Sequence, residues 1–246
     1  MDKIKRLGLL IVLFAALLLG SCTKDFEEIN TKPHGFTTAG DGALFNNIIK
    51  SLVPGGHEQF YINNEILYKQ TQLAALTNEA WGNFAQGTED IWKTHYRALP
   101  EIRELEKRFR EYEETPSVIN MKAMLKIILA LKTFKVTDFF GDIPFSEAGY
   151  GFHDLSLLIP GYDSQRDIYL ALLDDLKWAD ENIDELAEAD PPFTTFRSFD
   201  LLFNGDMLKW KKLANSLRLR HALRMSEKEP EIAGAIIKEI IENERP

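Results

Sequence analysis

Cysteine is almost absent from this chain of 246 residues, in which Cys22 is the only one. A lone cysteine excludes an intramolecular disulfide. Basic residues are also in the minority, because 29 lysines and arginines stand against 38 aspartates and glutamates and leave a formal net charge of −9. Nucleic acid is therefore not an expected partner, since binding to phosphates needs a basic surface. The five histidines lack the spacing of metal ligands, so the sequence predicts neither a metal site nor a cofactor.

Alternation of apolar and polar residues with a period of two is almost absent beyond residue 40, which argues against a β fold. Helical periodicity predicts an all-α fold instead. Expected helices cover about 43–52, 58–76, 88–113 and 117–140, a segment capped by Asp163 or Ser164, a segment from Asp206 to Met225, and a last segment from Pro230 to the end. Antiparallel pairs of such helices suggest tetratricopeptide-like hairpins, although a clean repeat of about 34 residues is not visible.

Several of these segments predict the environment of particular side chains. Segment 117–140 is apolar around much of its circumference, which is typical of a central helix. The side of this helix that faces solvent is expected to carry Lys122, Lys126, Lys132 and Lys135. The second helix is expected to bury Ile62, Ile66, Leu67, Leu73 and Leu76, and the fifth Ile168, Leu172, Leu176, Ala179, Ile183 and Leu186. Thr88 is expected to cap the third helix through its hydroxyl.

Residues 1–21 predict a lipoprotein signal peptide. Basic residues precede an apolar run at 7–19, which is too short to span a bilayer, since that takes about 20 residues. The run ends in LGSC at 19–22, which resembles a bacterial lipobox. Cleavage before Cys22 would leave this cysteine as an acylated first residue that anchors the protein to a membrane. The alternative is an ordinary secretory signal with an incidental cysteine.

The next segment, 22–39, is polar and is expected to be a flexible tether before a helical domain at 40–246. A lysine followed by acidic residues comes directly after Cys22. This run resembles the surface-export signal of outer-membrane lipoproteins in Bacteroidetes-type envelopes, which predicts exposure at the cell surface. A solvated leader is the alternative interpretation.

The segment 134–148, which we call the corner, changes character halfway through. Gly141 can adopt the left-handed conformation that closes a helix, and Pro144 prevents a restart nearby. Two acids, Asp138 and Asp142, flank the break. We interpret the corner as a structural joint between helical hairpins rather than as a reactive site.

A group of polar and basic residues near the end of the chain offers partners for these acids. An anion site is one interpretation of Asn215, Arg218, Arg220 and Arg224. A bidentate ion pair between one of the arginines and an acid of the corner is more economical. We hypothesise that Arg218 contacts Asp138 or Asp142.

Three segments together carry a resemblance to a known family. They are TDFFGDIPFSEA at 137–148, YDSQRDIY at 162–169 with LDDLKWA at 173–179, and GDMLKWKKLANSLRLR at 205–220. In this order and spacing they resemble the SusD/RagB family of nutrient-binding outer-membrane lipoproteins, in its SusD-like, starch-binding-associated subgroup. The resemblance covers nearly all of the chain after the signal peptide, and the lipobox agrees with it independently.

The resemblance implies an α-fold with tetratricopeptide repeats that caps a SusC-type TonB-dependent transporter at the cell surface. Such a protein captures an oligosaccharide or a peptide and passes it to the transporter, as a binding protein and not as an enzyme. Members of the family are typically about twice as long, so the chain resembles the N-terminal half of a member. Much of the family's ligand pocket would come from the other half.

Four residues are the best candidates for ligand contact: Trp81, Asn83, Phe84 and Trp92. Aromatic rings can stack on the apolar face of a sugar, and an amide can satisfy its hydroxyls. Trp92 and Tyr96 lie four residues apart in an expected helix, and we favour core packing for this pair. For Trp81 and Asn83, which lie in an expected loop, both interpretations stay open.

Catalysis has little support in the sequence. DFFG at 138–141 is superficially similar to a kinase metal motif, but no glycine-rich loop or catalytic-loop pattern accompanies it. Carboxylates are plentiful, yet most of them lie on charged helix faces rather than in a recognisable glycosidase pair. Two functions remain as alternatives to nutrient binding: a helical scaffold that contacts the transporter without binding ligand, and a glycoside hydrolase.

Overall fold

The computed structural model describes residues 39–74, 84–187, 193–242 and 245–246. Its helices are α3 (Asp41–Lys50), η1 (Glu58–Leu67), α4 (Tyr68–Gln70), α5 (Ala85–Glu111), α6 (Pro116–Phe140), η2 (Leu155–Leu158), α7 (Gln165–Asn182), α8 (Phe193–Arg197), α9 (Met207–Met225) and α10 (Pro230–Glu242). Within these ranges no β-strand occurs, and a single antiparallel bridge joins Ile143 to Asp163. The all-α prediction is confirmed.

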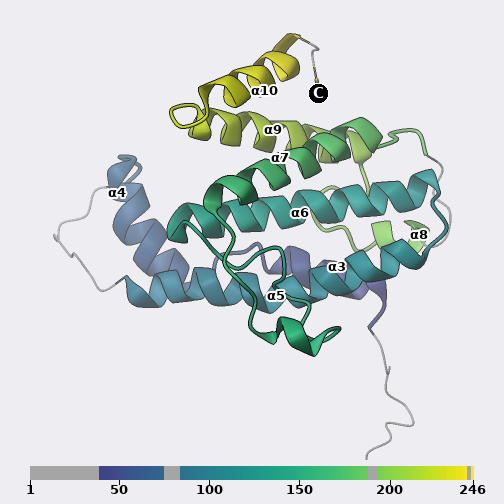
Figure 1. Ribbon diagram of the computed structural model, residues 1–246, viewed down its shortest axis with the longest axis horizontal. Helices are drawn as coiled ribbons and strands as arrows, with labels where there is room; N and C mark the ends of the chain where they lie inside the picture. The colour runs from purple at the N-terminus through teal and green to yellow at the C-terminus, as the bar shows by residue number, and fades with distance from the viewer. Residues whose placement is uncertain (1–38, 75–83, 188–192, 243–244) are drawn as a thin grey trace, which may run out of the picture. The chain divides into compact units, whose positions relative to one another are not determined.

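The long helices follow one another as antiparallel neighbours in the unit formed by residues 40–246 (Figure 1). α5 packs on α6, α6 on α7, α7 on α9, and α9 on α10. α6 also contacts α8 and α9, so it has neighbours both before and after it in the stack. These contacts give the predicted stack of helical hairpins with α6 at its centre.

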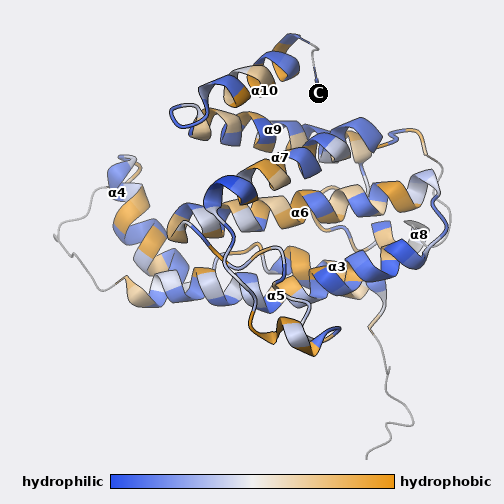
Figure 2. Cartoon of the chain, in the orientation of Figure 1, coloured by the Kyte–Doolittle hydropathy of each residue, from blue (hydrophilic) through white to orange (hydrophobic). Residues whose placement is uncertain are grey.

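The sequence of α6 accounts for its central position. Figure 2 shows hydrophobic residues along most of this helix, and Met121, Met124, Leu125, Ile128 and Phe134 are buried. The prediction that Lys132 lies on the side that faces solvent is wrong, because Lys132 is only 6% exposed. A helix turns about 100° per residue, so Lys126 and Lys132 point about 120° apart and cannot share one narrow face.

Capping residues mark the start of the strongest helices. Thr115 accepts from the Val118 N–H at 3.3 Å before α6, and Ser164 and Asp206 cap α7 and α9. The expected Thr88 cap is wrong. α5 begins at Ala85, and the Thr88 hydroxyl donates to the carbonyl of Phe84 at 3.1 Å instead. α5 continues through Pro100 to Glu111.

The second helix departs most from prediction. Residues 58–67 form η1, a π-helix with hydrogen bonds from i to i+5, and the three-residue α4 completes the segment. A period of 3.6 therefore does not apply, and of the four described residues that were expected to be buried only Ile62 is. Ile66 is half-buried, Leu67 and Leu73 are exposed, and Leu76 lies outside the described residues.

The later helices end earlier than their apolar patterns suggested. The stripe of α7 is buried from Ile168 to Ile183, but Leu186 is 91% exposed because the helix ends at Asn182. α10 ends at Glu242, so the expectation that it continues to Pro246 is wrong. No described helix is both long enough and apolar enough to cross a bilayer.

Candidate functional site

Gly141 closes α6 as the sequence predicted. Its φ is +74° and its ψ is −123°, a positive-φ conformation that glycine adopts at little cost. The Gly141 N–H donates to the Thr137 carbonyl at 2.8 Å, and the Thr137 hydroxyl donates to the Gly141 carbonyl at 2.6 Å. Pro144 follows and is buried. The corner is thus a fixed helix end rather than an open loop.

Asp163, just before α7, ties the second half of the corner to that helix. Its carboxylate accepts the N–H groups of Phe145 and Ser146, each at 2.9 Å, and the Ser146 hydroxyl at 2.7 Å. Burial alone would raise the pKa of Asp163, but the hydrogen bonds from Ser146 and Phe145 hold this pKa below its ordinary value. The carboxylate is therefore ionised at neutral pH and acts as a structural acceptor.

The two acids of the corner also have structural partners. Asp138 accepts from Arg224 Nε at 2.9 Å and from the Tyr169 hydroxyl. Asp142 Oδ1 accepts the backbone N–H of Gln165, the first residue of α7, at 2.8 Å. The sequence predicted that an arginine of the segment now seen as α9 would contact an acid of the corner. One does, and it is Arg224.

The hypothesis of an Arg218 contact with Asp138 or Asp142 is wrong. Arg218 Nη2 lies 3.1 Å from Glu239 Oε2, and Arg218 Nη1 lies 3.8 Å from Asp180 Oδ2. Arg224 lies six residues further along α9, about 9 Å along the helix axis, which brings it level with the corner. The packing of α9 on α7 decides between the two arginines.

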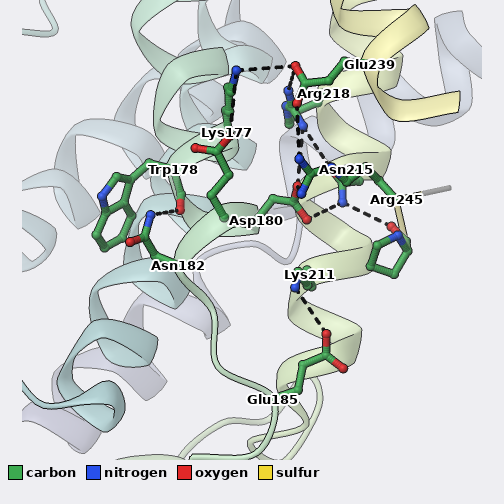
Figure 3. A network of polar contacts seen from close by, with 12 residues as sticks. Lys177, Trp178, Asp180, Asn182, Glu185, Lys211, Asn215, Arg218, Glu239 and Arg245 are labelled. Atoms are coloured by element: carbon green, nitrogen blue, oxygen red, sulfur yellow. Dashed lines mark hydrogen bonds and ion pairs between the residues drawn. The ribbon is translucent and has the colours of Figure 1, made fainter. Parts of the chain in front are cut away.

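Arg218 instead belongs to a buried polar network that joins α7, α9 and α10 (Figure 3). Asn215 Nδ2 donates to Asp180 Oδ1 at 2.7 Å, and Asn215 Oδ1 accepts from Arg218 at 3.1 Å. Arg245 Nη1 lies 3.1 Å from Asp180 Oδ2. Two acids thus meet two arginines here, and Asn215 and Arg218 hold helices together rather than forming an anion site.

Arg103 of α5 holds the corner, and sequence reasoning missed it. Its Nη2 donates to the Phe145 carbonyl at 2.8 Å and its Nε to the Ala148 carbonyl at 3.2 Å. The guanidinium also lies over the Tyr150 ring, 4.8 Å from its centroid. Arg103 follows the buried Leu99 by four residues, so helical periodicity could have placed it on the inner face.

The aromatic candidates divide between the described and undescribed parts of the chain. Trp81 and Asn83 lie outside the described residues, and so does the proposed anchor Cys22. Phe84 and Trp92 are half-buried and pack against the core. The Trp92 ring lies 4.5 Å from that of Tyr96, whose hydroxyl donates to the Pro144 carbonyl at 2.8 Å. Trp92 and Tyr96 therefore pack beneath the corner, as the core interpretation expected.

A cavity of about 1020 Å³ is lined by residues of η1, α5, α6 and α9. Ligand pockets commonly occupy about 300–1,000 Å³, so this cavity is large enough for an oligosaccharide unit. Its charged and imidazole lining consists of Glu58, His95, Lys132, Lys135, Asp138, Arg220, His221 and Arg224. No candidate from the sequence except Asp138, Arg220 and Arg224 lines it.

Three buried groups of this cavity have strongly shifted pKa values, among them His221, whose pKa is lowered to about 4 by burial and by the charges of Arg220 and Arg224. Burial, reinforced by the charges of Lys132 and Arg103, lowers the pKa of His95 to about 3. Burial, reinforced by Lys135, lowers the pKa of Lys132 to about 8. Across the described residues, no cluster of histidine, cysteine and acidic side chains has the arrangement of a metal site.

A family profile described as starch-binding and associating with the outer membrane, SusD-like, matches residues 33–246. The chain belongs to the SusD-like family. This match includes every segment on which the resemblance was based. No curated protein matches the SusD-like chain.

Solved structures share the fold of this SusD-like protein. A chitin-binding protein aligns with a TM-score of 0.67 and 26% identity, over 83% of this chain and 43% of its own. A SusD homolog from Parabacteroides distasonis aligns with a TM-score of 0.67 and 21% identity, over 81% of this chain and 38% of its own. A SusD-like protein from Bacteroides thetaiotaomicron aligns with a TM-score of 0.60 and 21% identity, over 81% and 41%. The SusD-like chain thus spans less than half the length of these structures.

Proposed function

We propose that this SusD-like protein binds a glycan or another nutrient at the cell surface and delivers it to a SusC-type TonB-dependent transporter. The observation that carries the proposal is the family match over residues 33–246. The likeness to a chitin-binding protein at 26% identity supports a glycan as the ligand. The family description names binding and no reaction, so we infer that the protein binds its ligand without turning it over.

The proposed location rests on the N-terminal segment and on the family description. Residues 1–21 would be removed, and lipid on Cys22 would anchor the chain to the outer membrane, with residues 22–39 as a tether. Radiolabelled palmitate should be incorporated by the wild-type chain and not by Cys22→Ala. Labelling of both proteins would contradict the anchor.

We propose that Trp81 and Asn83, with Phe84, contact the ligand from the segment before α5. Phe84 is half-buried just before that helix, where it packs against the core and remains partly accessible. Trp92 has core partners, and its contribution would be to support this segment. Affinity electrophoresis against chitin and starch oligosaccharides tests the proposal. Trp81→Ala should abolish retardation, whereas Trp178→Ala on α7 should not.

One observation favours the scaffold alternative. The chain covers only 38–43% of the three solved structures named above, so residues outside this chain could supply their pockets. A scaffold would associate with the transporter but bind none of the oligosaccharides. Copurification with the transporter, combined with failure to bind the whole panel, would favour the scaffold over nutrient binding. Turnover of any oligosaccharide would instead favour a glycoside hydrolase.

A further inference from the structure

The cavity between η1, α5, α6 and α9 has a surplus of positive charge that the rest of the chain lacks. Four cations line it, Lys132, Lys135, Arg220 and Arg224, against two carboxylates, Glu58 and Asp138. The whole chain, in contrast, carries a formal net charge of −9. A local surplus of this sign attracts anions.

Both carboxylates of the cavity already have partners. Glu58, which is buried, is contacted by Lys135, and Asp138 is contacted by Arg224 and Tyr169. These contacts use two of the four cations. The charges of Lys132 and Arg220 are left over, because neither lies within 4 Å of a carboxylate in the described part of the chain.

Lys132 combines burial with an unused donor. Its Nζ donates to the Ser51 carbonyl at 3.0 Å and to the Ser51 hydroxyl at 2.9 Å. An ammonium has three donors, so one remains. A buried cation without a carboxylate is costly, and a bound anion would remove that cost.

His95 provides a second, independent indication of a ligand. It is 2% exposed, lines the cavity, and neither ring nitrogen has a hydrogen-bond partner among the described residues. Because its pKa is about 3, it is neutral at pH 7 and offers one donor and one acceptor. A hydroxyl group, which also donates and accepts, is complementary to this pair.

The remaining lining suits the apolar face of a sugar ring. Phe139 lies in the wall and is 42% exposed, and Leu131 and Leu223 line the same cavity. Phe134 is not available for stacking, because the His221 ring covers it at 3.6 Å between centroids. Phe139 is therefore the aromatic side chain that a sugar would meet.

We propose that this cavity binds a sugar acid, with the carboxylate at Lys132, a ring hydroxyl at His95, and the apolar face of the sugar against Phe139. The inference rests on the proposed nutrient-binding function and names the chemical class of the nutrient. It assigns the ligand to a place distinct from the segment around Trp81, which it neither requires nor excludes. Arg220, at the exposed side of the cavity, would attract the acid.

Calorimetric titration of the full chain in detergent tests this assignment with three probes: tetragalacturonate, a neutral galactose tetrasaccharide, and a tetraglutamate peptide. Tetragalacturonate should bind at least about tenfold more tightly than either of the others, since one charge-assisted hydrogen bond is worth about that factor. Lys132→Met should lower its affinity about tenfold, and His95→Leu should lower it by a smaller factor. Binding should weaken above pH 8, where Lys132 loses its proton.

Lys122→Met is the matched control, because Lys122 lies on the same helix and pairs with Glu114 away from the cavity. Arg220→Gln is a second test that cannot disturb the core, and it should lower the affinity for tetragalacturonate about threefold. Equal affinity for the acidic and neutral tetrasaccharides, or unchanged affinity in Lys132→Met, would overturn the assignment and leave the proposed function intact. Equal affinity for tetraglutamate would overturn the sugar component. Failure to bind any glycan would overturn both proposals.

Discussion

Two buried arginines of this protein, Arg103 and Arg218, differ from two buried groups of the cavity, Lys132 and His95, in whether a carboxylate pairs with them. Arg103 donates to two carbonyls and lies 3.0 Å from Glu106, and Arg218 faces Glu239 and Asp180. Lys132 and His95 are buried to a similar degree but have no acidic partner in the described structure. Native proteins pair nearly all buried polar groups. The arginines therefore hold the fold together, whereas the proposed ligand would supply the missing partners of Lys132 and His95.

The largest expected effect comes from Arg218→Met. The substitution leaves Glu239 and the fully buried Asp180 without one of their cations, so the free energy of unfolding should fall by about 3–5 kcal/mol. Urea denaturation measures this loss. The control is Arg224→Met, because the Arg224 side chain is 56% exposed and loss of its ion pair with Asp138 should cost less than about 1 kcal/mol. Similar losses of unfolding free energy in both variants would show that the ion pairs of Arg218 are no more important for stability than that of Arg224.

Acid should destabilise the protein through His95. The unfolded state takes up a proton below pH 6.5, whereas the native state does so only near pH 3, so stability is lost as pH falls through this window. Between pH 6.5 and pH 4 the contribution of His95 should be on the order of 3 kcal/mol. His95→Leu should show a correspondingly smaller loss of stability in acid. An unchanged pH profile would show that His95 is not buried in its neutral form.

Arg103→Met should loosen the corner rather than the core. Loss of the bonds to the Phe145 and Ala148 carbonyls should cost about 2 kcal/mol, since hydrogen bonds to a charged group contribute about 1.5–3 kcal/mol. The effect should appear as faster proteolysis within residues 141–162. Arg110→Met on the exposed face of α5 is the matched control. Cleavage at equal rates in both variants would argue against Arg103 as the support of the corner.

An effect of similar size is expected from Lys132 in alkaline solution. Its native pKa of about 8 lies below the ordinary value of 10.5, so the native state loses a proton before the unfolded state does. Stability should therefore rise with pH between 8 and about 10 relative to Lys132→Met, by roughly 2 kcal/mol. Thermal unfolding of the two proteins in parallel measures the difference. Parallel pH profiles would contradict the burial of this charge.

Sequence patterns predicted those features of the fold that depend only on residues close together in the chain. The apolar stripe of α7, the Ser164 and Asp206 caps and the positive φ of Gly141 were all available from residue types and spacing. η1 was not, because a π-helix changes the period on which burial is predicted. Lys132 was misplaced because α6 is apolar on nearly all sides, so its sequence has no clear outer face.

Contacts between distant helices were the other limit. The sequence indicated that an arginine of α9 meets the corner, but only the packing of α9 on α7 selects Arg224 over Arg218. The sequence did not predict His95 or Glu58 as site residues, because each is an isolated polar residue in its own helix. Only the packing of η1, α5 and α6 brings the two residues to one cavity. Periodicity carries no information about such an enclosure.

Hydrogen–deuterium exchange with and without saturating tetragalacturonate tests most directly whether the cavity, and not the segment after α6, binds the ligand. The account expects ligand-induced protection in η1, residues 58–67, because Glu58 and Leu67 form one wall of the cavity. Peptides from residues 141–162, which follow the end of α6, should exchange at unchanged rates, because their polar contacts are already made within the protein. Protection confined to residues 141–162, with none in η1, would contradict the assignment of the cavity as the ligand site.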